Sequence, residues 1–170
     1  MPEEFKQYLK EFAQNFRLPD YNEIPDVGLY LEQTAKYISQ LGQLGDVVIT
    51  GSMISNYVKK GLISNPVKKQ YSREQIAYLM FITMAKTVLS LDDIRLLIEL
   101  QKETYEPEVA YNYLAAEFKN VLGYVFGIKD EIETIGKNNH EAKSMLRNLI
   151  ITVAHKAYLD MCFKYYRNRE

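Results

Sequence analysis

The sequence is poor in several residue types, and each shortage excludes a class of protein. Its 170 residues contain a single cysteine, Cys162, so a disulfide framework and a four-cysteine zinc site are excluded. The longest apolar runs, residues 76–82 and, counting glycines, 121–128, are far shorter than the roughly 20 residues that span a bilayer. Residues 1–4 lack the basic and apolar regions of a signal peptide. We therefore expect a cytoplasmic protein without a membrane segment.

Acidic residues are missing from one part of an otherwise balanced chain. The formal net charge is −1, and 25% of the residues are charged against 47% hydrophobic, which is typical of a globular protein. Residues 1–49 hold 4 Lys or Arg and 8 acids, and residues 74–170 hold 12 and 14, whereas residues 50–73 hold 5 and none. Composition alone is equally compatible with a solvated surface and a DNA-binding face. The absence of acids favours DNA, because carboxylates repel phosphates.

Apolar residues recur at helical spacing along most of the chain, and strand-like alternation is almost absent. We therefore predict an all-α, mainly helical fold with about seven helices and at most one two-stranded ribbon. The expected helices cover residues 3–16, 25–41, 50–60 and 72–85, begin at Ser90 and at Pro107, and end with 141–166. The helices at Pro25 and Pro107 are expected to bury Val27 and Val109. Residues 47–49 are a candidate short extended segment.

The basic stretch, residues 50–73, carries the residues that typically begin and end helices and turns, in an order that indicates a single structural unit. Thr50 or Ser52 can cap a short helix, and Gly61 is a natural residue to end it. Residues 62–70 contain Pro66 and are expected to form a loop or a small hairpin. Ser72 and Gln75 then fit the capping box of the next helix. This order of helix, break, short helix, turn, loop and helix is typical of a helix-turn-helix with a wing.

The short helix is expected to divide into a buried face and a DNA-reading face. Met53, Ile54, Tyr57 and Val58 would pack inward, so that one polar stripe points outward. The residues predicted to read bases are Ser52, Ser55, Asn56 and Lys59, and those predicted to hold phosphates are Thr50, Lys60, Lys68, Lys69 and Arg73. Small hydrogen-bonding groups suit base edges, and longer cations suit phosphates.

Three segments of the chain resemble known sequences. Residues 49–63 (ITGSMISNYVKKGLI), 69–76 (KQYSREQI) and 89–94 (LSLDDI) resemble the MerR-type winged helix. Together with residues 18–31 (LPDYNEIPDVGLYL), they are similar to an uncharacterised Firmicute family, domain of unknown function 1836, over residues 18–100. The resemblance implies a DNA-binding fold. The wing at 62–71 is shorter than in MerR proteins and lacks their arginines, the preceding helix is longer, and no metal-binding cysteines follow. The sensing function of MerR proteins is therefore not implied.

These observations predict a sequence-specific DNA-binding transcriptional regulator, with no enzymatic activity and no cofactor or metal. Residues 1–17 would form an N-terminal helix, 18–104 the winged helix-turn-helix, and 105–170 a helical region that joins two copies into a homodimer on double-stranded DNA. The alternative is a winged-helix protein-interaction module whose basic stretch meets an acidic partner.

Other reactive residues have simpler explanations. His140 and His155 lack metal-ligand spacing, Asp92 and Asp93 suit a helix cap, and Cys162 is more typical of a buried thiol than of a nucleophile. Four tyrosines near the start of the C-terminal region are interpreted as core or interface residues ahead of a ligand cavity: Tyr105, Tyr111, Tyr113 and Tyr124.

Overall fold

The computed structural model describes residues 1–41, 44, 48–137 and 139–168. Within them lie seven α-helices, a short 3₁₀ helix and one two-stranded antiparallel sheet, which confirms the prediction of a mainly helical fold. In chain order the elements are α1 (Glu3–Asn15), η1 (Tyr21–Glu23), β1 (Leu29–Tyr30), α2 (Leu31–Gln40), α3 (Gly51–Lys59), β2 (Gln70–Tyr71), α4 (Arg73–Ala85), α5 (Leu91–Thr104), α6 (Pro107–Val125) and α7 (Glu141–Arg167).

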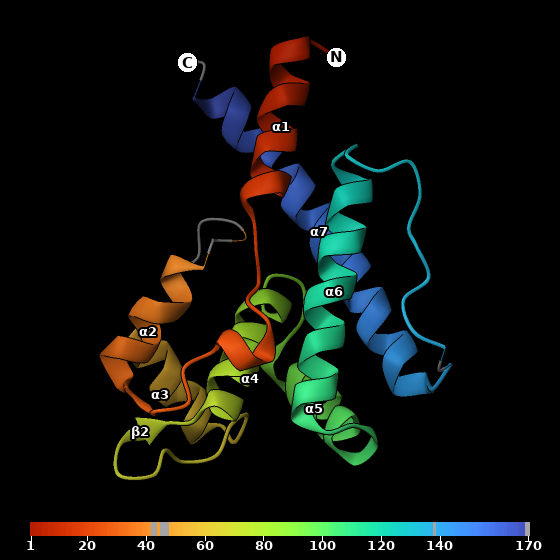
Figure 1. The fold of residues 1–170 in the computed structure, drawn as a ribbon. Helices are drawn as coiled ribbons and strands as arrows, with labels where there is room; N and C mark the ends of the chain where they lie inside the picture. Colours follow the sequence, from red (N-terminus) through yellow and green to blue (C-terminus); the bar gives the residue numbers. More distant parts are fainter. Residues whose placement is uncertain (42–43, 45–47, 138, 169–170) are drawn as a thin grey trace.

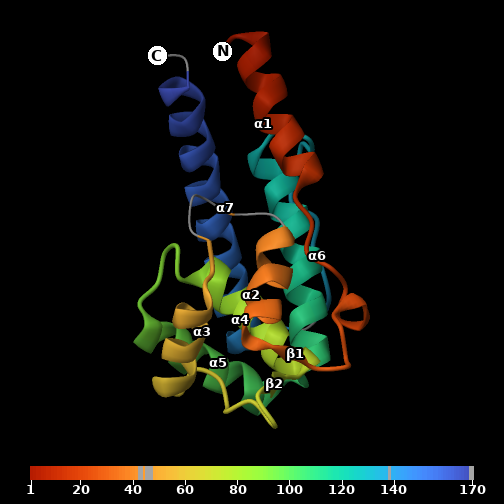
Figure 2. The ribbon, with the colours of Figure 1, turned by 90° about the vertical axis from the view of Figure 1, so that its left-hand side faces the viewer.

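The helices pack around α4, which is buried on nearly every side. Ile76, Leu79 and Ile82 have no exposed surface, and α4 contacts α2, α6 and α7. The two longest helices, α6 and α7, lie along one another, and α1 packs against both of them (Figure 1). The three predicted segments of the chain therefore share one hydrophobic core. The α2–α3 pair and the β-sheet lie at the end of the molecule away from both termini (Figure 2).

Most helix ends follow the predicted local signals. Ser72 and Gln75 form the capping box of α4, and the Ser90 side chain accepts a hydrogen bond from the backbone N–H of Asp93. At the end of α3, Gly61 has a φ of +74°, and its N–H donates to the carbonyl of Val58 (3.0 Å). The N–H of the following residue donates to the carbonyl of Tyr57 (3.0 Å), which completes a Schellman motif.

The predicted helix beginning at Pro25 is wrong. Helix α2 begins only at Leu31, and Val27 is 78% exposed rather than buried. The residues before α2 are held in another conformation because Gly28 has a φ of +77° and β1 pairs with β2, some forty residues later in the chain. Helix α2, which precedes α3, therefore has 10 residues and is shorter than the helix predicted over residues 25–41. Of the candidate extended segment 47–49, Val47 lies outside the described residues, and the other two residues form no strand.

At the start of α6 one predicted core residue is wrong, whereas Leu114 and Phe118 farther along the helix are buried as predicted. Val109 is 56% exposed, whereas Tyr111 is buried. The Tyr111 ring packs against Tyr21, with ring centres 6.0 Å apart, and its hydroxyl lies 3.6 Å from the sulfur of Met80 on α4. Contacts with α4 and with the η1 segment therefore decide that Tyr111, and not Val109, is buried at the start of α6.

Candidate nucleic-acid interface

Helix α3 presents a polar face to solvent. Its inner side buries Ile54 and Tyr57, and the Thr50 hydroxyl oxygen caps the helix by accepting a hydrogen bond from the N–H of Met53 (3.3 Å). The four residues predicted to read bases are all exposed and lie on one side of the helix, here called the outer face of α3: Ser52, Ser55, Asn56 and Lys59. Lys60, directly after the helix, is exposed as well.

A small hairpin (residues 62–71) follows α3 and lies beside it (Figure 2). At its end, Val67 and Gln70 exchange two backbone hydrogen bonds of 3.1 and 2.9 Å, so the turn has only two central residues. These are Lys68 and Lys69, with φ values of +51° and +65°, as in a type I′ turn. Such turns favour Asn and Gly. This hairpin instead carries two exposed lysines, the tip lysines, in a conformation that is unfavourable for them.

Gln75 attaches the hairpin to the first turn of α4. Its side-chain Nε2 donates to the carbonyls of Ser64 (2.9 Å) and Asn65 (3.2 Å), while Oε1 accepts from the N–H of Ser72 (2.9 Å). The side chain is 8% exposed. Sequence reasoning assigned Gln75 to the capping box and missed its second role, because nothing local to Gln75 shows which loop its amide reaches.

Arg73 does not join the predicted phosphate-binding group. Its Nε donates to the carbonyl of Ile24 (2.7 Å), and its Nη2 lies 3.6 Å from an Asp26 carboxylate oxygen. The guanidinium carbon also lies 5.8 Å from the centre of the Tyr21 ring. These contacts fix the segment before β1 onto α4, so Arg73 is a structural cation in this fold.

The remaining predicted cations are not neutralised. In the part of the chain that the structure describes, no carboxylate lies within 4 Å of the amino groups of Lys59, Lys60 or the tip lysines. Lys86 at the end of α4 adds a cation that sequence reasoning missed; its Nζ lies 5.6 Å from the centre of the Tyr57 ring. An acid also lies close to α3: the carboxylate of Glu32 on α2 lies against Gly51 in the first turn of α3. A carboxylate is favourable at this positive end of a helix.

Other predicted candidates are placed elsewhere. His140 caps α7, its Nδ1 accepting from the N–H of Ala142 (3.2 Å), and His155 is exposed. Cys162 is half-buried, and this burial raises the pKa of its thiol. Among the described residues no three His, Cys, Asp or Glu side chains gather as metal ligands, and none of the helices there is long and apolar enough to cross a membrane.

The geometry defines a helical protein with an exposed, cation-rich helix and hairpin. The family model of a domain of unknown function, DUF1836, matches residues 19–114, more than half of the chain, and the protein belongs to this family. The match includes all of the candidate interface and continues into α6, beyond the predicted domain boundary at residue 104. No curated protein and no solved structure matches the chain.

Proposed function

We propose that the protein is a sequence-specific DNA-binding transcriptional regulator whose α2, α3 and hairpin form a MerR-like winged helix-turn-helix. The observation that carries this proposal is the combination of the outer face of α3 with the neighbouring tip lysines. Every one of these side chains is exposed, and none of the lysines is paired with a carboxylate of the described residues. Helix α2 packs against α3.

The chemistry of the outer face suits the major groove. Ser52, Ser55 and Asn56 carry short hydrogen-bonding side chains, and an Asn amide can pair with adenine in two hydrogen bonds. Lys59 reaches guanine acceptors from the last turn. Lys60 and the tip lysines contact phosphates on either side, and Thr50 can donate its hydroxyl hydrogen to a phosphate while its oxygen continues to cap α3.

The test is selection of duplexes bound by the full chain from a random-sequence DNA pool, followed by affinity measurements on the selected duplex over a range of salt. Contact with about four or five phosphates predicts a log-affinity against log-salt slope of roughly −4. Asn56→Ala should weaken binding to the selected duplex about tenfold and leave binding to an unrelated duplex unchanged.

A charge-matched control distinguishes phosphate contacts at the hairpin from the general attraction between positive charge on the protein and DNA. Changing Lys68 and Lys69 together to Ala should weaken binding to every duplex and reduce the steepness of the salt slope by about 2. Changing the exposed Lys119 and Lys164 of α6 and α7 together to Ala removes the same charge and should leave the slope unchanged. Enrichment of no duplex, or equal slopes for the two double variants, would refute the proposal. The alternative of an acidic protein partner predicts that no duplex is enriched.

We further propose that α7 joins two copies into a homodimer, as a two-fold operator requires. Leu159, Phe163 and Tyr166 are 50%, 55% and 54% exposed, and their spacing places them on one face of α7. Light scattering on the full chain should give twice the chain mass, and Phe163→Lys should give a monomer. A wild-type protein that is monomeric at every concentration reached would exclude this arrangement.

A further inference from the structure

A cavity of about 150 Å³ lies where the end of α5, the start of α6 and the first turn of α7 meet the loop that precedes α7. Its walls are mainly apolar and include Val109, Ala110 and the rings of Tyr105 and Tyr113. An apolar cavity of roughly this size accommodates one benzene-sized ring. The cavity belongs to neither the outer face of α3 nor the hairpin.

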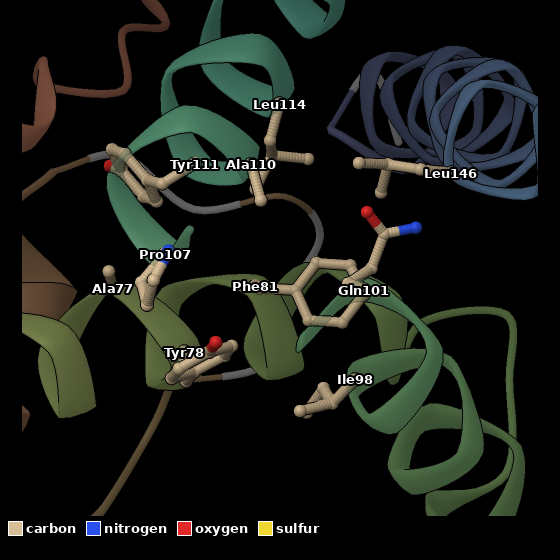
Figure 3. A pocket seen from close by; sticks show the side chains of 10 residues that line it. All are labelled: Ala77, Tyr78, Phe81, Ile98, Gln101, Pro107, Ala110, Tyr111, Leu114 and Leu146. Carbon is tan, nitrogen blue, oxygen red and sulfur yellow. The ribbon is translucent and has the colours of Figure 1, made fainter. Parts of the chain in front are cut away.

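Gln101, one of the residues that line the cavity, carries a buried polar atom that has no hydrogen-bond partner among the described residues. Gln101 of α5 is 6% exposed; its Nε2 donates to the carbonyl of Ala142 (2.6 Å), but its Oε1 accepts no hydrogen bond. Gln101 and Ala110 also line a smaller apolar cavity of about 40 Å³ between α4, α5, α6 and α7, where the amide lies near Phe81 and Leu146 (Figure 3). A donor on a bound molecule would satisfy this acceptor.

Two cations at the same cavity are unneutralised. Lys143 of α7 donates from Nζ to the carbonyl of Gly136 (3.2 Å), and the same atom lies 5.3 Å from the centre of the Tyr113 ring. Lys137 lines the cavity from the preceding loop. Within the described ranges, neither ammonium has a carboxylate within 4 Å. A ring-sized apolar space next to unpaired cations is complementary to an aromatic acid.

We propose that this cavity binds a single-ring aromatic carboxylate that carries a hydroxyl group. The ring occupies the apolar space beside Tyr105 and Tyr113, and the carboxylate contacts the amino groups of Lys143 and Lys137. The hydroxyl supplies the missing donor to Gln101 Oε1. This binding does not depend on DNA recognition, so it can be tested and can fail separately from the proposed function.

The experiment is calorimetric titration of the full chain with three probes: 4-hydroxybenzoate, phenol, which lacks the carboxylate, and acetate, which lacks the ring. We expect saturable one-to-one binding of 4-hydroxybenzoate, at least about tenfold tighter than either comparator. Lys143→Met should weaken that binding about tenfold. Lys119 is an exposed residue of α6 that does not line the cavity, and Lys119→Met, which removes the same charge, should not change the affinity.

A second variant tests the cavity without altering charge. Ala110→Phe places a ring in the space proposed for the ligand and should abolish binding, with circular dichroism and the melting temperature showing that the chain is folded. If Ala110→Phe does not fold, Lys143→Met decides the question by itself, because Lys143 is a partly exposed residue in the first turn of α7. No binding of 4-hydroxybenzoate up to about 10 mM, equal binding of phenol or acetate, or unchanged affinity in Lys143→Met would each overturn the proposal.

Discussion

Replacing the tip lysines with the residues that their backbone prefers should stabilise the protein and weaken DNA binding at the same time. The change is Lys68→Asn together with Lys69→Gly, which places the favoured Asn-Gly pair in a two-residue turn with two positive φ angles. Both side chains are exposed and make no ion pair in the described part of the chain, so no packing is lost.

The magnitude follows from the two φ angles. A non-glycine residue in the left-handed region costs roughly 1–2 kcal/mol, and Asn tolerates this region better than Lys. The greater freedom of Gly in the unfolded chain opposes this gain and lowers the free energy of unfolding by roughly 0.5–1 kcal/mol. The net gain in the free energy of unfolding should therefore be about 1–2 kcal/mol, which for a chain of this length raises Tm by about 3–6 °C. Loss of two phosphate contacts should make the salt slope less steep by about 2.

Thermal and urea unfolding followed by circular dichroism measure the first effect, and salt-dependent affinity for the selected duplex measures the second. The double variant Lys119→Ala with Lys164→Ala is the control, because it removes the same charge without touching the turn. A lower Tm would refute the account of strain at the hairpin tip. A higher Tm with unchanged DNA affinity would show that these lysines contact no phosphate. Only opposite changes in stability and affinity agree with the reasoning.

Three further predictions concern stability. Gly61→Ala should cost roughly 1–2 kcal/mol in urea unfolding, because the new Cβ meets no atom within 4 Å and the whole cost is backbone strain. Arg147 Nε lies 2.9 Å from an oxygen of Glu117, whose side chain is 1% exposed, so Arg147→Met should cost about 3–5 kcal/mol; adding Glu117→Leu should recover part of it, and no recovery would contradict a buried-charge penalty. Burial raises the pKa of Tyr78 and Tyr113 from 10.0 to about 12. The folded chain holds these two protons more tightly than the unfolded chain does. The contribution of the two tyrosines to the free energy of unfolding should therefore be fully present below pH 10 and be lost as the pH rises to about 12, and ultraviolet absorbance should show tyrosines that ionise above pH 10.

Much of the helical framework could be predicted because its signals are local. The capping residues Thr50, Ser72 and Ser90 each hydrogen-bond a backbone group three residues later, and Gly61 ends α3 through bonds to the preceding turn. Such contacts depend on the residues within one helical turn, so they can be read from the sequence. The alternation of buried and exposed positions on α3 was predictable for the same reason.

The candidate interface was only partly predictable. The outer face of α3 follows from helical spacing, and the positive charge of the hairpin follows from its composition. Arg73 looked like another surface cation, yet it bonds to the carbonyl of Ile24, which is 49 residues away in the chain. Gln75 looked like a capping residue alone, yet its amide also holds the hairpin. A side chain's partner across the fold cannot be derived from spacing, because many distant groups could satisfy it equally well.

By itself, the sequence determined the helical class of this protein, the ends of most helices, and the concentration of positive charge between residues 50 and 73. These properties depend on hydrogen bonds within a helical turn and on the net charge of a short segment. The tertiary structure decided where α2 begins, which residue is buried at the start of α6, what Arg73 binds and which side chains line the cavity beside Gln101. Each of these results depends on which distant surfaces pack together, and packing is settled by the shape and hydrogen bonding of the whole core.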